Sequence, residues 1–207
     1  MGFYNFNEEG ALAADSAQSG SKVLDTGVYK VTVVTASKVI ASTGATGIDW
    51  SIHVEGSKYP NMVYGMWVFK SNGDRIFNMD IVDSLMGIVG VKTLTEFDKM
   101  IDVKGGTKQV TALKELDGVK CQVAIQKEFD AYNGKVTEKN IIKAFFTPDG
   151  KTYAESVGNK PAKQIEYYRN KLKDNETTAY KQFKAEGNTQ VNEVDTSYEE
   201  ANGGSIL

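Results

Sequence analysis

The order of apolar patterns along this chain restricts its fold more than any other feature, because strand patterns occur on both sides of one helical pattern. The expected strands share an alternation of apolar with polar residues and are rich in β-branched and aromatic side chains. They are residues 28–38, 48–54, 62–69, 119–126 and 141–146. Three strands therefore precede the helical segment, and two follow it.

The helical segment lies between the third and fourth expected strands. Apolar residues recur at spacings of three and four over residues 78–89, with Asn78 expected as the N-cap and Gly90 as the end of the helix. A shorter helix is expected at residues 95–101. The dipeptide Asn133-Gly134 is the strongest short-range signal for a hairpin turn, and it joins the last two strands.

Three strands, a helix and a hairpin are the element order of the five-stranded oligonucleotide/oligosaccharide-binding barrel, the OB-fold. A β-sandwich would need about seven strands at regular spacing, and a parallel α/β sheet would alternate strands and helices from its start. We therefore expect a mainly β chain built on an OB-fold barrel, with the helix between strands three and four.

Composition divides the chain into four regions. Residues 1–22 are rich in small and polar side chains and are expected to form a flexible arm, and residues 23–159 the OB-fold domain. Residues 160–185 contain seven bases and three acids and are expected to form a basic amphipathic helix. Residues 186–207 are expected to be a disordered acidic tail.

The tail is the most strongly charged of these regions. Residues 185–207 contribute five acids and no base, so the overall charge of −3 leaves +2 for residues 1–184. We expect the tail to contact partner proteins, or to compete with nucleic acid as a polyanion. The residues expected to do this are Glu193, Asp195, Glu199, Glu200, Ile206 and Leu207.

Catalytic and metal-binding motifs are missing from the sequence. His53 is the single histidine and Cys121 the single cysteine, which excludes a metal site of several such residues and leaves one possible base for a catalytic triad. No segment has the spacing of a phosphate-binding loop. We expect no enzymatic activity and no cofactor, although an Asp/Glu metal nuclease stays open. The lone cysteine and the lack of a long apolar run fit the cytoplasm.

The third expected strand offers aromatic rings on which the bases of a single strand could stack. Its alternate residues form two faces, which are Val63, Gly65, Trp67 and Phe69, and Met62, Tyr64, Met66 and Val68. The second set is more typical of packing, which leaves Trp67 and Phe69 as stacking candidates. The alternative has Trp67 in the core and Tyr64 exposed. Trp50, in the second strand, is more typical of a core residue and is a weaker candidate.

Lysines accompany these aromatic residues. The tip of the last hairpin carries Tyr132 and lies in the loop that OB-folds use to hold a bound strand. The lysines expected to contact phosphates there and along the groove are Lys30, Lys70, Lys127, Lys135 and Lys139. The hairpin lysines are equally compatible with a solvated hairpin, and the groove lysines, each taken singly, are more typical of solvated surface charges. Because residues 1–159 have a net charge near −2, binding should rest on stacking and weaken with salt.

Together these segments resemble the single-stranded DNA-binding proteins of tailed bacteriophages, which join an OB-fold to an acidic tail. The matching segments are 26–31 (TGVYKV), 78–91, 116–120 (LDGVK), 132–136 (YNGKV) and the tail. The resemblance implies coating of single-stranded DNA in phage replication, recombination and repair, in the cytoplasm of a bacterial host. It also implies that the tail contacts replication or recombination proteins. The segment 205–207 (SIL) lacks the Phe common in such tails, so these partners stay open.

Two other functions are compatible with the same residues. The barrel could be a protein-interaction or phage structural module that binds no nucleic acid and keeps its aromatic residues in the core. It could also be a recombination accessory that anneals complementary single strands. A homodimer is compatible with each of the three functions.

Overall fold

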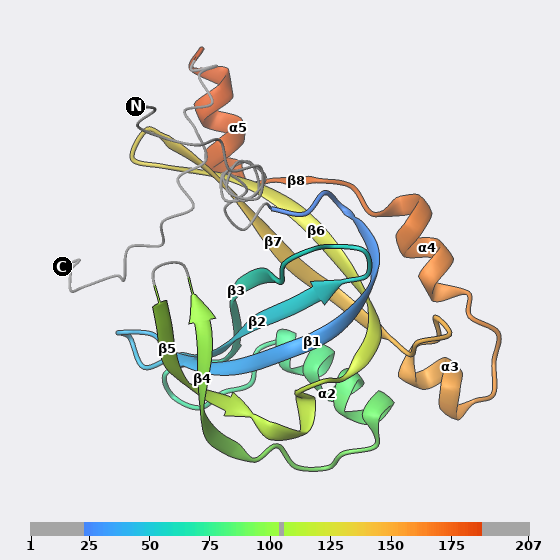
Figure 1. Ribbon diagram of the computed structural model, residues 1–207. Helices are drawn as coiled ribbons and strands as arrows, with labels where there is room; N and C mark the ends of the chain where they lie inside the picture. The colour runs from blue at the N-terminus through green and yellow to red at the C-terminus, as the bar shows by residue number, and fades with distance from the viewer. Residues whose placement is uncertain (1–22, 104–105, 188–207) are drawn as a thin grey trace, which may run out of the picture.

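A computed structural model describes residues 23–103 and 106–187, and the protein is mainly β (Figure 1). Its strands form one sheet that is antiparallel except for the short β6–β8 pair. The strands are β1 (Gly27–Ile40), β2 (Thr46–Val54), β3 (Asn61–Phe69), β4 (Glu96–Val103), β5 (Gly106–Leu113), β6 (Lys120–Tyr132), β7 (Lys135–Phe146) and β8 (Asn175–Glu176). The helices are α2 (Asn78–Val89), η1 (Lys114–Leu116), α3 (Tyr153–Val157), α4 (Gln164–Lys171) and α5 (Thr178–Ala185). The expected mainly β class is confirmed.

Strand β1 is the point at which the sheet branches. Residues 31–40 pair with β2, which pairs in turn with β3. Residues 27–32 also pair with β6, whereas Ser37 and Lys38 pair with β5. The hairpins β4–β5 and β6–β7 extend from these two junctions (Figure 1). Strands β3 and β7 contact each other, but no ladder joins them within the described residues, so the sheet is not closed.

The core lies between the sheet and α2. The helix buries Ile81, Val82 and Leu85, as its apolar spacing predicts. On the sheet side, Trp50 and Phe145 meet with ring centroids 5.1 Å apart. The helix expected at residues 78–89 is confirmed, and it ends at Gly90, whose φ of 75° lies in the left-handed region that glycine adopts without strain.

The expected cap of α2 is wrong. Phe77 occupies the N-cap position and makes no side-chain hydrogen bond there. The side-chain amide of Asn78 instead donates to the carbonyl oxygen of Trp67, at 3.0 Å. Asn78 therefore connects the start of α2 to strand β3 and does not cap its own helix.

The helix expected at residues 95–101 is also wrong, because this segment lies in β4. All of β4 pairs with β5, from Glu96 opposite Leu113 to Val103 opposite Gly106. The ammonium of Lys99 donates to the carbonyl of Val34 (2.9 Å) and to the carboxylate of Asp117 (2.6 Å). Pairing along the backbone and this anchor to β1 outweigh a local helical pattern.

Residues 160–185 form two short helices and not the single basic helix that the sequence predicts. Helix α4 ends before Leu172, and the chain then pairs as β8 with β6. Thr177 starts α5 as a side-chain N-cap, since its hydroxyl accepts a hydrogen bond from the N–H of Tyr180. The break follows from the polar stretch between the helices, in which the side chains of Asn175 and Thr177 donate to carboxylates of β6.

The remaining expectations on chain organisation concern residues at the ends. The arm at residues 1–22 and nearly all of the acidic tail, from residue 188 on, lie outside the described residues. Within the described residues, no helix has the length and apolar character that crossing a bilayer requires.

Candidate nucleic-acid interface

The indole of Trp67 lies on the outer surface of β3 and is supported by the backbone of β2. Gly47 pairs with Trp67 across the strands, and an ideal Cβ on Gly47 would stand 2.7 Å from Cε3 of the indole. Gly65 approaches a different part of the indole, because its ideal Cβ would be 3.6 Å from Nε1. The side chain remains 38% exposed. Two glycines thus lie next to the indole, and part of the ring is open to solvent.

Strand β3 does not follow the strict alternation that the sequence predicts. Gly65 has a φ of +67°, and the register with β2 shifts between Ile48 and Trp50. The N–H of Gly65 donates to the carboxylate of Asp49 at 2.7 Å, which holds this irregularity in place. A β-bulge of this kind reverses which alternate residues face inward.

The bulge divides both predicted faces of β3. Val63 belongs to one predicted face and Met66 and Val68 to the other, yet all three are buried. Tyr64 and Trp67, from opposite predicted faces, are both exposed. The expectation that one whole face is core is therefore wrong, whereas the exposure of Trp67 agrees with the preferred assignment.

Two aromatic candidates do not share this surface. Trp50 is fully buried, so it offers no ring face to a ligand and leaves the set of stacking candidates. Phe69 is half-buried and packs against the core, where it lines a hollow of about 370 Å³ between the sheet and α2 with Met79 and Met86. A further register shift between Thr46 and Gly47 separates Phe69 from Trp67.

A half-buried carboxylate, that of Asp49, lies beside Gly65 and is influenced by the charge of a lysine. Burial raises the pKa of Asp49 above its ordinary value, although the hydrogen bond from Gly65 and the charge of Lys108 oppose this shift. Lys108 lies in β5, so the β4–β5 hairpin brings a positive charge to the side of β2 that carries Asp49. Sequence reasoning missed Lys108 because it placed a helix and a loop in this part of the chain.

Phe77 is a second exposed aromatic residue that sequence reasoning missed. Its side chain is 73% exposed, the highest value among the large apolar side chains of the described residues. The Phe69–Arg75 bridge and the hydrogen bond from the Ile76 N–H to the Val68 carbonyl hold the preceding residues along β3. The sequence signal was an aromatic residue directly before a helix, where a polar cap is the rule.

The expected groove lysines are engaged with acids. Lys30 lies 3.5 Å from the carboxylate of Glu55, and Lys70 lies 4.0 Å from that of Asp74. All four side chains are well exposed, so these pairs hold their partners weakly. Both lysines can still turn toward a phosphate, but each brings an acid close to the same place.

The β6–β7 hairpin carries the other expected residues. Tyr132 is exposed at its tip and pairs with Lys135, which has no ion pair within the described residues. In contrast, Lys127 and Lys139 bind carboxylates of the opposite strand. These contacts are Lys127 with Glu138 (2.7 Å) and Lys139 with Glu128 (3.0 Å).

The hairpin tip is not adjacent to Trp67. In Figure 1 the tip lies beside α5, well separated from β3. Phe129 stacks on Tyr180 of α5, with ring centroids 5.4 Å apart. Tyr132 and Lys135 thus belong to the hairpin tip beside α5, and Tyr64 and Trp67 to β3, so the expected residues form two separate surfaces.

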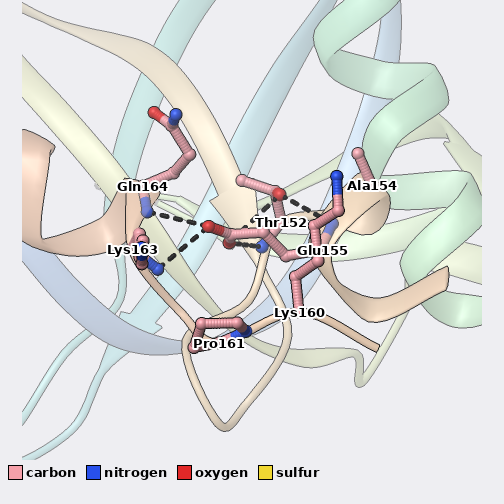
Figure 2. A pocket seen from close by; sticks show the side chains of 7 residues that line it. All are labelled: Thr152, Ala154, Glu155, Lys160, Pro161, Lys163 and Gln164. Atoms are coloured by element: carbon pink, nitrogen blue, oxygen red, sulfur yellow. Dashed lines mark hydrogen bonds between the residues drawn. The ribbon is translucent and has the colours of Figure 1, made fainter. Parts of the chain in front are cut away.

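A further hollow lies between α3 and α4, and its lining has a structural explanation. Figure 2 shows the carboxylate of Glu155 pointing at the backbone of both helices. It accepts hydrogen bonds from the N–H groups of Thr152, Lys163 and Gln164, each at 2.9 Å. Burial disfavours the charged form, but these bonds outweigh it and lower the pKa of Glu155. Its oxygens are thus occupied in joining the two helices.

The described residues contain no cluster of three or more His, Cys, Asp or Glu that could hold a metal ion. Cys121 is buried, and burial raises the pKa of its thiol to about 12, which leaves it unreactive near neutral pH.

No protein family matches this chain, and no curated protein shows significant similarity to it.

Proposed function

We propose that the protein binds single-stranded DNA without sequence specificity. The observation that carries this proposal is the partly exposed indole of Trp67, held against Gly47 on the outer surface of β3. A ring seated in this way loses little conformational freedom when a base stacks on it, and base stacking on aromatic side chains tolerates any sequence. Exposed Tyr64, three residues earlier, extends the same strand surface.

We further propose that the sheet is a variant of the OB-fold. Strands β1, β2 and β3, helix α2 and the β6–β7 hairpin have the expected order, and β1 pairs with β6 as the first strand of such a barrel pairs with the fourth. The β4–β5 hairpin is then an insertion between helix and hairpin. The contact between β3 and β7 is where a closed barrel would have its last ladder.

The charge distribution supports binding that rests on stacking more than on phosphate contacts. Four of the five lysines expected to contact phosphates have an acidic partner. Because each phosphate contact adds to the dependence of affinity on salt, we propose moderate affinity and a shallow salt dependence.

We propose, from the resemblance of the sequence to phage single-stranded DNA-binding proteins, a role in phage DNA replication, recombination and repair. Coating of exposed strands is the shared task of those proteins, and the acidic residues of 186–207 are proposed to contact replication or recombination proteins. Binding to oligo-dT is the first requirement for this role.

The proposal is tested by titrating oligo-dT into the protein at two salt concentrations while following tryptophan fluorescence. Trp50 is buried and Trp67 exposed, so the Trp50→Phe variant should lose a larger fraction of its fluorescence on binding than the wild type. The Trp67→Phe variant, which retains Trp50, should show little quenching although it still binds by gel shift. Failure to form any complex at low salt and micromolar protein would reject the proposed function, and the protein-interaction alternative would then be preferred.

A further inference from the structure

The segment that connects β3 to α2 lies along β3 at the position of Trp67. The Phe69–Arg75 bridge sets an antiparallel register between this segment and β3. In this register Trp67 lies opposite Phe77, because each is two residues away from the bridge on its own segment. Two hydrogen bonds flank Phe77, from the Ile76 N–H to the Val68 carbonyl (2.8 Å) and from the Asn78 side chain to the Trp67 carbonyl (3.0 Å).

Trp67 and Phe77 are the exposed aromatic residues of this short pairing. Val68 is buried and Ile76 is half-buried, whereas Trp67 is 38% and Phe77 is 73% exposed. At Phe77 the backbone already has helical angles (φ −47°, ψ −32°), so the ring stands where the segment turns from the strand edge into α2.

Phe77 contributes little to the stability of the fold. Its ring is mostly in water, and it makes no capping hydrogen bond at a helix position where Ser, Thr, Asp or Asn would stabilise α2. An exposed aromatic ring is what the stacking of a base requires. The nearby acids Asp80 and Asp83 are both bound by Arg75, at 2.9 and 2.6 Å, which reduces their repulsion of a phosphate backbone.

We propose that Phe77 is a second stacking residue for single-stranded nucleic acid, and that it holds the base next to the one on Trp67. This inference rests on the proposed function and names a residue of the same site. A strand would follow the outer edge of β3, with successive bases against the two rings and its phosphates toward solvent.

The test compares two substitutions that differ in the aromatic ring. Phe77→Leu keeps a large apolar side chain without a π face, and Phe77→Tyr keeps the π face. Tyr167→Leu is the matched control, because Tyr167 is similarly exposed (61%) but lies on α4. Affinity for oligo-dT is measured by gel shift or anisotropy, and folding by thermal unfolding. We expect Phe77→Leu to weaken binding about 5- to 100-fold, and Phe77→Tyr and Tyr167→Leu to bind like the wild type.

The outcomes separate this inference from the proposed function. Wild-type protein that binds no oligo-dT overturns both. Wild-type binding that depends on Trp67 but is unchanged in Phe77→Leu overturns the role of Phe77 alone, and then points to a protein partner for this ring. Equal loss in Phe77→Leu and Phe77→Tyr also overturns stacking, because it shows that the shape of the side chain is what matters.

Discussion

The indole of Trp67 covers the backbone of Gly47 so closely that a methyl group on Gly47 would stand 2.7 Å from Cε3 of the ring. Such a distance is shorter than any stable carbon–carbon contact, which is about 3.5 Å or more. The two residues therefore form one unit, in which the absence of a side chain on β2 determines the position of the ring on β3.

Substitution Gly47→Ala should displace the indole and weaken binding to oligo-dT. We expect a loss of about 1–2 kcal/mol in binding free energy, within the range of one stacked base. Two matched variants serve as controls. Gly87→Ala creates an equally close contact, with the ring of Tyr153, away from β3, and Gly27→Ala meets only ordinary contacts at 3.4 Å. An unchanged affinity of Gly47→Ala would show that the seat of the indole is not needed for binding.

Trp50 should tolerate replacement by Phe far better than by Ala. Its ring is fully buried, but its Nε1 has no hydrogen-bond partner within the described residues, and a buried unsatisfied donor costs free energy. Phe removes this donor and retains most of the packing against Phe145. We expect Trp50→Phe to lower the free energy of unfolding by less than about 1.5 kcal/mol, and Trp50→Ala by about 3–5 kcal/mol. Denaturant titration measures both, and similar losses would contradict this explanation.

The carboxyl group of Asp49 should make stability depend on pH in an unusual direction. Burial, the larger effect, raises its pKa above the ordinary 3.8, so the ionised form is disfavoured in the folded protein. The protonated carboxyl of Asp49 therefore stabilises the folded protein at pH values below the ordinary pKa. This stabilisation is lost as the pH rises through the folded-state pKa. The Asp49→Asn variant keeps an oxygen that can accept the bond from Gly65.

We therefore expect Asp49→Asn to be more stable than the wild type at neutral pH. The difference between the two proteins should vanish toward about pH 3, where Asp49 is protonated in both folded and unfolded chains. Chemical denaturation at several pH values measures this difference. A variant less stable than the wild type at neutral pH would show that the attraction to Lys108 outweighs the cost of burial.

Glu155 should show the opposite dependence. Burial opposes its ionisation, but hydrogen bonds from Thr152, Gln164 and Lys163 lower its pKa below the ordinary 4.5. Its stabilising contribution is therefore present above 4.5 and is lost as the pH falls through the lower folded-state value. Glu155→Gln presents an amide to these donors and should cost about 2 kcal/mol at neutral pH. Equal stability of variant and wild type at pH 7 would remove Glu155 as the joint between α3 and α4.

The hairpin lysines should differ in their effect on salt dependence. Lys135 has no ion pair within the described residues, whereas Lys127 is bound to Glu138 at 2.7 Å and is largely covered. If the hairpin tip contacts phosphates, Lys135→Ala should reduce the slope of log K against log salt by about 0.7, the value for one single-strand contact. Lys127→Ala should change this slope less. Slopes measured by fluorescence titration that fall equally in both variants would contradict this difference.

The sequence predicted the long strands from their alternation and their β-branched and aromatic residues, although burial follows the alternation only in part: residues 121–125 of β6 are all buried, and β3 contains a bulge. It failed for β4 because Phe97, Met100 and Ile101 have helical spacing by coincidence, while the pairing with β5 that decides the structure is not local. The single helix expected at residues 160–185 failed for a related reason. Polar side chains between α4 and α5 bond to β6, which a one-dimensional pattern does not contain.

The site was predicted in part. Trp67 was identified from the alternation of β3, because the set of residues with Met66 and Val68 is more typical of packing and leaves Trp67 exposed. The joint exposure of Tyr64 required the bulge at Gly65. A glycine inside a strand pattern was the available signal for that bulge. Likewise, the Asn133-Gly134 turn fixes a register that places Glu128 opposite Lys139, so the neutralisation of this lysine was already encoded. The position of Phe77 depended on the turn after β3, where Asn72-Gly73 is the same kind of signal, but we expected no pairing with β3 beyond that turn.

The branching of the sheet at β1 has a consequence for the order in which the protein folds. Its pairing with β2 begins at Ile40 opposite Thr46 and closes a loop of a few residues, whereas its pairing with β6 joins Thr32 to Lys120 across most of the domain. Loop closure costs more entropy as the loop lengthens, and non-local pairing slows folding. We expect the β1–β2–β3 meander and the β6–β7 hairpin to form first as independent units. The seam between β1 and β6 should then close late and set the folding rate.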